Sequence, residues 1–219
     1  MSKVKKKQIV RALLEMHGRT FVRELGIELK RNTPSPLFRL LCLSLLTSAP
    51  LGAGAAMRAC KALGSAGWTT PAKMADSTWE ERVKVLNENG YARYDEKTAR
   101  QLGILTDHVQ ETYEGDLRRL RSEANGDIKK ARRLLKEFKG IGGVGADIFL
   151  REVQVCWDEF RPFADKMALK SSGKLNLGDD AETLAERVDS NDFTRLVAAL
   201  VRTQLAKDHD RVLEVAGAS

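Results

Sequence analysis

Hydrophobic residues recur along most of the chain at the three- and four-residue spacing of amphipathic α-helices. Alternation typical of a β-strand occurs at Val153, Val155 and Trp157, but no second segment could pair with it. Segment 37–46 is apolar on nearly all sides, as expected of a helix at the centre of a core. Besides short helices near residues 71, 78 and 181, the pattern predicts helices at about 4–16, 21–29, 37–46, 53–63, 96–124, 128–138, 144–155 and 191–205. We therefore expect an all-α protein.

Capping residues mark where several of these helices should begin. Ser35 and Pro36 fit the N-cap and the first helical position of the apolar helix. Ser77 and Glu80 have the spacing of a capping box. Asp127 can cap the basic helix that follows it.

Positive charge is concentrated in two segments of the chain. The net charge is +7 over 219 residues. Residues 1–31 carry nine Lys or Arg against three Glu, which gives +6, and residues 129–139 carry six against one, which gives +5. Such runs favour a polyanionic partner, although a solvated helix surface would explain either run equally well.

The lengths of the apolar runs and the positions of the cysteines indicate the cellular compartment in which the protein is expected. No apolar run approaches the roughly 20 residues that cross a bilayer, and no apolar segment follows the basic N-terminus as in a secretory signal. Cys42, Cys60 and Cys156 are scattered, so neither a disulfide framework nor a metal site is expected. We therefore expect a reducing compartment and no membrane association: the cytoplasm with its nucleoid, or a nucleus.

Residues 140–145 match the spacing G-x-G-x-x-G. A dinucleotide-binding loop would need a preceding strand, whereas residues 129–139 are charged and helix-patterned. A tight turn between two helices fits better, and the free amides at the start of the second helix would suit a DNA phosphate. An ordinary turn that needs glycine for packing is the alternative. The residues expected at the DNA are Lys139, Gly140, Gly142, Gly143, Val144 and Gly145.

Residues 134–147 resemble the helix-hairpin-helix motif of the endonuclease III-like (HhH-GPD) superfamily of DNA glycosylases, with its pattern L-x-x-h-x-G-h-G-x-x-x-A, where h is apolar. That superfamily places an Asp about twenty residues further on, after a proline-containing connection, as in residues 161–165 here. The similarity extends in order over about residues 36–205. Further matching stretches are 43–48, 90–91 with 97–99, and 174–180.

The resemblance implies a two-lobed helical fold. Residues 36–145 would form a helical barrel lobe that ends in the hairpin. Residues 1–35 and 146–219 would form the second lobe, which carries Asp165. Double-stranded DNA would lie in the cleft between the lobes, and the protein would act as a monomer.

The implied activity is DNA glycosylase activity in base-excision repair. Such an enzyme flips a damaged base and breaks its bond to C1′ through a cationic sugar, which a carboxylate can stabilise. By resemblance Asp165 is this carboxylate, although it could equally serve as a helix N-cap. We expect an alkylated purine as substrate, because its leaving group is already cationic and no general acid is evident.

Two departures from the family pattern narrow the expected chemistry. Val144 stands where bifunctional relatives have the lysine that forms a Schiff base, so water should be the nucleophile. Lys166 is the substitute amine if a lyase step exists. No cysteine follows Cys156, so no iron–sulfur cluster is expected, while the hairpin could hold a monovalent cation. The alternatives are a non-catalytic DNA-binding protein of the same fold and a bifunctional enzyme with a displaced lysine.

Other residues are candidates for contacts with DNA. By resemblance, Ser48 and Pro50 lie near the sequence position where many relatives have a glutamine that fills the gap left by the flipped base. Pro50 cannot hydrogen-bond the orphaned base as glutamine does, so it could act only as an apolar wedge. Tyr91 and Tyr94 lie in a polar segment and could stack on a base. Lys170 could contact a phosphate or simply be a surface lysine.

Overall fold

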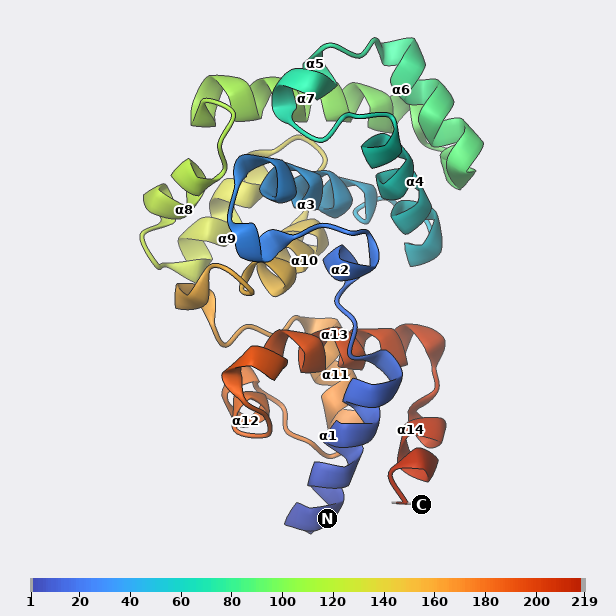
Figure 1. The fold of residues 1–219 in the computed structure, drawn as a ribbon, viewed down its shortest axis with the longest axis vertical. Coiled ribbons are helices and arrows are strands. Elements are labelled where there is room, and N and C mark those ends of the chain that lie inside the picture. Colours follow the sequence, from blue (N-terminus) through green and yellow to red (C-terminus); the bar gives the residue numbers. More distant parts are fainter. Residues whose placement is uncertain (1, 218–219) are drawn as a thin grey trace. The chain divides into compact units, whose positions relative to one another are not determined.

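The structure is a computed structural model that describes residues 2–217, and all regular elements in this part of the chain are helical (Figure 1). The expected all-α class is confirmed. The alternating segment around Val155 is no strand: α10 (Gly143–Val153) ends at Val153, and a turn leads from there into the 3-10 helix η3 (Asp158–Phe160). None of the described helices has the length and hydrophobicity needed to cross a membrane.

The chain divides into two compact units: Leu25–Phe160, here the central unit, and residues up to Glu24 with those from Arg161, here the terminal unit. The expected segment 36–145 lies inside the central unit, which extends further in both directions. It does so because η1 (Leu29–Arg31) and α10 both pack against α3 (Pro34–Leu46).

The central unit is built around α3. This helix contacts α4, α7 and α10, and its buried side chains run from Leu37 to Leu46 without interruption except at Arg39. The expectation of a central apolar helix is confirmed. The remaining helices of this unit are α4 (Ala53–Ser65), α5 (Pro71–Ala75), α6 (Trp79–Leu86), the π-turn η2 (Asn87–Tyr91), α7 (Asp95–Tyr113), α8 (Arg118–Ala124) and α9 (Ile128–Glu137).

The terminal unit combines both ends of the described chain. Its centre is α13 (Ser190–Ala206), which contacts four other helices through a largely buried face that includes Leu196, Val197 and Leu200. The other helices are α1 (Lys3–His17), α2 (Phe21–Glu24), α11 (Lys166–Lys174), α12 (Ala181–Ala185) and α14 (His209–Val215).

Two helix starts differ from the expected positions by one or two residues. Helix α3 begins at Pro34 after Thr33, because Pro34 also lacks an amide hydrogen and fits the first helical position. The capping box belongs to Thr78 and Glu81, since the Ser77 hydroxyl donates to the Met74 carbonyl at 2.6 Å instead.

The helix expected over residues 96–124 is two helices. Helix α7 ends at Tyr113, and Glu114 and Gly115 follow with φ values of 50° and 78°. This left-handed pair terminates the helix, and α8 starts at Arg118. The expected cap of the basic helix α9 is confirmed: the Asp127 carboxylate accepts the amides of Lys129 and Lys130 at 2.8 and 3.0 Å.

Candidate functional site

The glycine cluster forms a tight turn between α9 and α10, as expected, and the element before it is a helix. The Ile141 amide donates to the Phe138 carbonyl at 3.0 Å and closes the turn. Phe138 and Ile141 are buried, whereas Lys139 and Gly140 are exposed. The turn is therefore anchored by two apolar side chains and presents its backbone outward.

Two of its glycines are required by packing or conformation. Gly140 has φ of +95°, and a Cβ there would lie 2.7 Å from Cδ1 of Leu45. A Cβ on Gly145 would lie 2.8 Å from the Ser44 carbonyl oxygen and closer still to Oγ of Ser48. The hairpin thus packs directly on the end of α3, and packing alone explains these two glycines.

Neither packing nor a positive φ explains the glycine at position 142. It is exposed, its backbone is extended (φ −90°, ψ −169°), and a Cβ there would meet nothing within 4 Å. It occupies the N-cap position of α10, where it supplies no side-chain acceptor for the first-turn amides. An uncapped helix start carries partial positive charge and suits an anion.

The surroundings of this helix start are apolar and basic. Val144 is 63% exposed on the first turn of α10, and Lys139 is exposed on the turn before it. Lys129, Arg133 and Lys136 extend the exposed positive charge along α9. The hairpin therefore combines open amides with long-range attraction for a polyanion.

Arg132 and Asp147 form a clamp between α9 and α10 that sequence reasoning missed. The Arg132 guanidinium donates to both Asp147 oxygens at 2.6 and 3.2 Å, and the bond to this carboxylate raises the Arg132 pKa. Asp147 is the fifth residue of α10, so it lies beyond the N-cap position of that helix. Arg132 and Asp147 are fifteen positions apart and lie on different helices, so no helical periodicity predicts their contact.

Ser48 and Pro50 follow the end of α3. The Ser48 hydroxyl donates to the Ser44 carbonyl at 2.8 Å and lies against Gly145, so the structure brings Ser48 and the hairpin together. Pro50 is exposed. Its role as a wedge stays a prediction.

The expectation that Tyr91 is available to stack on a base is wrong for this structure. Tyr91 is fully buried, its hydroxyl donates to the Leu46 carbonyl, and burial raises its pKa to about 12. The preceding Gly90, with φ of +84°, belongs to the π-turn that leads into this buried position. Tyr94 is half-buried, with the Arg93 guanidinium 5.6 Å from its ring centroid, and remains a candidate.

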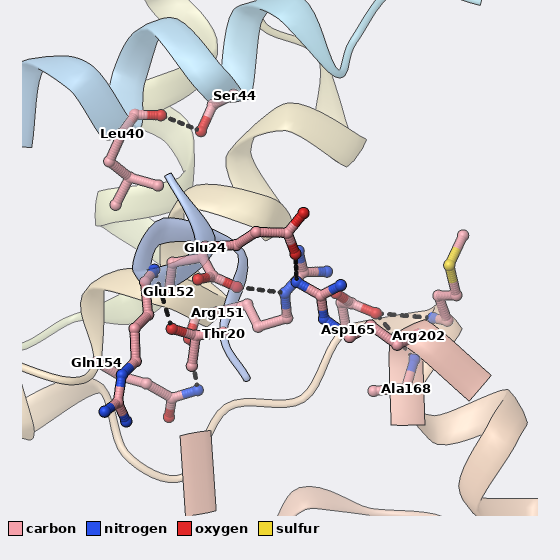
Figure 2. A network of polar contacts seen from close by, with 12 residues as sticks. Thr20, Glu24, Leu40, Ser44, Arg151, Glu152, Gln154, Asp165, Ala168 and Arg202 are labelled. Atoms are coloured by element: carbon pink, nitrogen blue, oxygen red, sulfur yellow. Dashed lines mark hydrogen bonds and ion pairs between the residues drawn. The ribbon is translucent and has the colours of Figure 1, made fainter. Parts of the chain in front are cut away.

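Asp165 lies in the terminal unit as the N-cap of α11. Its Oδ1 accepts the backbone amides of Met167 and Ala168, each at 2.9 Å (Figure 2). The residue is 7% exposed, while Lys166 and Lys170 on the same helix are exposed. The N-cap role is therefore present, and it is compatible with a catalytic one.

Among residues 2–217, two cysteines are buried and the metal-ligating side chains form no cluster. Cys42 and Cys60 are buried, and burial raises the Cys60 pKa to about 12, which disfavours a thiolate nucleophile. No group of three or more His, Cys, Asp or Glu side chains in this range could hold a metal ion. The monovalent cation expected at the hairpin stays a prediction.

Comparison of the sequence with models of protein families and with curated proteins finds no match.

Proposed function

We propose that this protein binds double-stranded DNA through the α9–α10 hairpin and is a monofunctional DNA glycosylase of the helix-hairpin-helix class. The observation that carries the proposal is the open start of α10. Gly142 leaves the first-turn amides without a side-chain acceptor, although a larger residue would fit there. The exposed lysines and arginine of α9 add attraction for phosphate.

Asp165 is the proposed catalytic carboxylate. Its two amide hydrogen bonds hold one oxygen in a fixed position. In the proposed reaction the target nucleotide is flipped out of the stack, and the C1′–N bond breaks with its electron pair leaving on the base. The carboxylate stabilises the cationic sugar, and water adds to C1′ as Asp165 takes its proton. The products are a free base and an abasic site.

Val144 supports a reaction without strand cleavage. A valine side chain has no amine and cannot form a Schiff base with the sugar. We therefore expect borohydride to trap no covalent adduct between the protein and an abasic duplex. A trapped adduct that disappears in Lys166→Gln would instead assign the lyase role to Lys166.

An alkylated purine is the proposed substrate. Its base carries a positive charge before the bond breaks and leaves as a neutral molecule, so it demands little protonation. A general acid is not evident on the helix that Asp165 caps, because the residues of α11 are uncharged or basic.

The second candidate function is DNA binding without catalysis. One observation favours it: Asp165 already accepts two first-turn amides of α11, and this N-cap role suffices to explain an aspartate at that position. Both candidates share the hairpin as the DNA-binding element.

Asp165→Asn separates the two functions. Asparagine caps a helix about as well as aspartate, so the fold and the DNA affinity should persist. Base release under single-turnover conditions should fall by about 100-fold or more if Asp165 is catalytic. Asp180→Asn is the matched control, because Asp180 caps α12 in the same unit through the Thr183 amide at 2.6 Å. Equal turnover in both variants would exclude a catalytic Asp165.

A further inference from the structure

Two further positive charges lie on α4, outside the two basic segments identified in the sequence. Between Arg39 and Lys73 the only charged residues are Arg58 and Lys61. They are three positions apart on α4 and therefore project from the same side of the helix. Local sequence thus offers these two cations no carboxylate.

Both cations line a pocket of about 510 Å³ in the central unit. The other lining residues are Ala62, Ser65, Ala66, Val85 and Asn89. None of the seven is acidic. The size falls within the roughly 300–1,000 Å³ that is typical of small-ligand pockets.

The Arg58 side chain lies between two glycines. A Cβ on Gly90 would be 2.8 Å from one terminal nitrogen of the guanidinium, and a Cβ on Gly54 would be 3.5 Å from the other. Gly90 also has φ of +84°, which other residues rarely adopt. The backbone therefore leaves room for the guanidinium at this place.

Within residues 2–217, Arg58 and Lys61 have no ion pair or side-chain hydrogen bond. A second pocket of the same unit shows the contrast. It is lined by Arg118 and Arg121, but Arg118 pairs with Asp116 at 2.6 Å and Arg121 pairs with Glu159 at 2.6 Å. Charge is neutralised in that pocket and left unpaired in the pocket on α4.

We infer that the pocket of Arg58 and Lys61 is a second anion site, which binds a phosphate group. A guanidinium and an ammonium on one side of a helix supply the donors that a phosphate requires. Ser65 contributes a hydroxyl group. The Asn89 side-chain amide is held in one orientation, because its nitrogen donates to the Val85 carbonyl at 2.8 Å. The Val85 side chain adds an apolar lining residue to the pocket.

The phosphate can come from the DNA backbone or from a free phosphate ester. The first source rests on the proposed DNA binding, because the site would then add a backbone contact to that of the hairpin. The second source is independent of it. The anion chemistry is the same in both cases.

The test compares wild-type protein with Arg58→Gln/Lys61→Gln. The control is Lys73→Gln/Lys97→Gln, which removes the same charge from exposed lysines of the same unit that line neither pocket. Inorganic phosphate is titrated at constant ionic strength, and amide chemical shifts of residues 58–66 and 85–90 are followed. Phosphate should bind to wild type and control, and about tenfold more weakly to the pocket variant. Equal responses in all three proteins would overturn the inference.

Salt dependence of DNA binding then identifies the source of the phosphate. Loss of two backbone contacts should lower the slope of log K against log salt by about 1.8, since each neutralised phosphate contributes about 0.9. An unchanged slope with lost phosphate binding would assign the site to a free phosphate ester. Gly142→Asp, which alters only the hairpin, should leave the phosphate response intact. A failure of the proposed function is thereby distinguished from a failure of this site.

Discussion

Helices α10 and α11 each begin after a residue with extended backbone, but the two starts differ in what satisfies their first amides. At α10 the preceding residue is Gly142, which has no side chain and is exposed. At α11 it is Asp165, whose carboxylate accepts two first-turn amides and is buried.

The difference shows how one property of helices can serve two purposes. The partial positive charge at a helix start is available to an outside anion when glycine precedes it, and it holds an internal carboxylate when aspartate does. Under the proposed function the first arrangement recruits a DNA phosphate, and the second fixes the carboxylate that acts on the sugar. Exchanging features between the two starts tests this account.

Gly145→Ala should have the largest effect on stability. The new methyl group would collide with the Ser44 carbonyl and the Ser48 hydroxyl, so α10 could no longer pack on α3 at its present distance. We expect a loss of about 2 kcal/mol in the free energy of unfolding, measured by urea denaturation.

Gly173→Ala in α11 is the matched control for that change. A Cβ there would meet nothing within 4 Å, and the residue is helical and exposed. The variant should gain about 0.5–1 kcal/mol, because alanine loses less backbone entropy in a helix. Equal effects at the two glycines would contradict the close packing of α10.

Gly142→Asp should convert the start of α10 into that of α11. The new carboxylate would take up the first-turn amides and repel phosphate. We expect DNA affinity to fall at least about tenfold, which is about 1.4 kcal/mol, in fluorescence anisotropy at fixed salt.

Gly142→Asn distinguishes capping from charge. It offers a neutral cap of nearly the same shape, so the affinity should fall less than in Gly142→Asp. If both variants bound DNA as wild type does, the start of α10 would not be the phosphate contact.

Asp165→Ala should lower stability less than Gly145→Ala does. It removes the N-cap of α11 and should cost about 1 kcal/mol in thermal or urea unfolding. Asp165→Asn should cost less than Asp165→Ala, since asparagine retains the cap. A large loss in Asp165→Asn would mean that the charge itself stabilises the terminal unit.

The helical class and the hairpin could be predicted because both depend on local signals. A nearly continuous apolar segment identifies α3, and Asp127 before the basic segment identifies the start of α9. Glycines clustered between two helical patterns indicate a tight turn. Each of these features is determined by neighbours within a few residues.

Two kinds of feature could not be predicted: the choice between neighbouring residues that could both cap a helix, and features that depend on tertiary contacts. Ser77 and Thr78 are both good capping residues, and only the contact of Ser77 with Met74 decides between them. Tyr91 lies in a polar segment yet is buried, and its hydroxyl donates to the Leu46 carbonyl. Unit boundaries at 24 and 160 follow from packing on α3 that periodicity does not reveal.

The candidate sites likewise contain some residues that could be predicted from the sequence and others that could not. Gly142, Val144 and Asp165 were identified from sequence pattern and resemblance, and the structure gives each a defined environment. Arg58 and Lys61 were missed, because their unpaired state appears only when the surroundings of α4 are known. The absence of any acidic residue between Arg39 and Lys73 was the one available sequence signal.

Base release from duplexes that each carry a single lesion tests the central claim most directly. The protein should release an alkylated purine, and strands should break at that position only after alkali treatment, because the product is an intact abasic site. Breaks without alkali would contradict the water-dependent reaction assigned to Asp165. No release from any duplex, with salt-dependent DNA binding retained, would contradict catalysis and leave a DNA-binding protein.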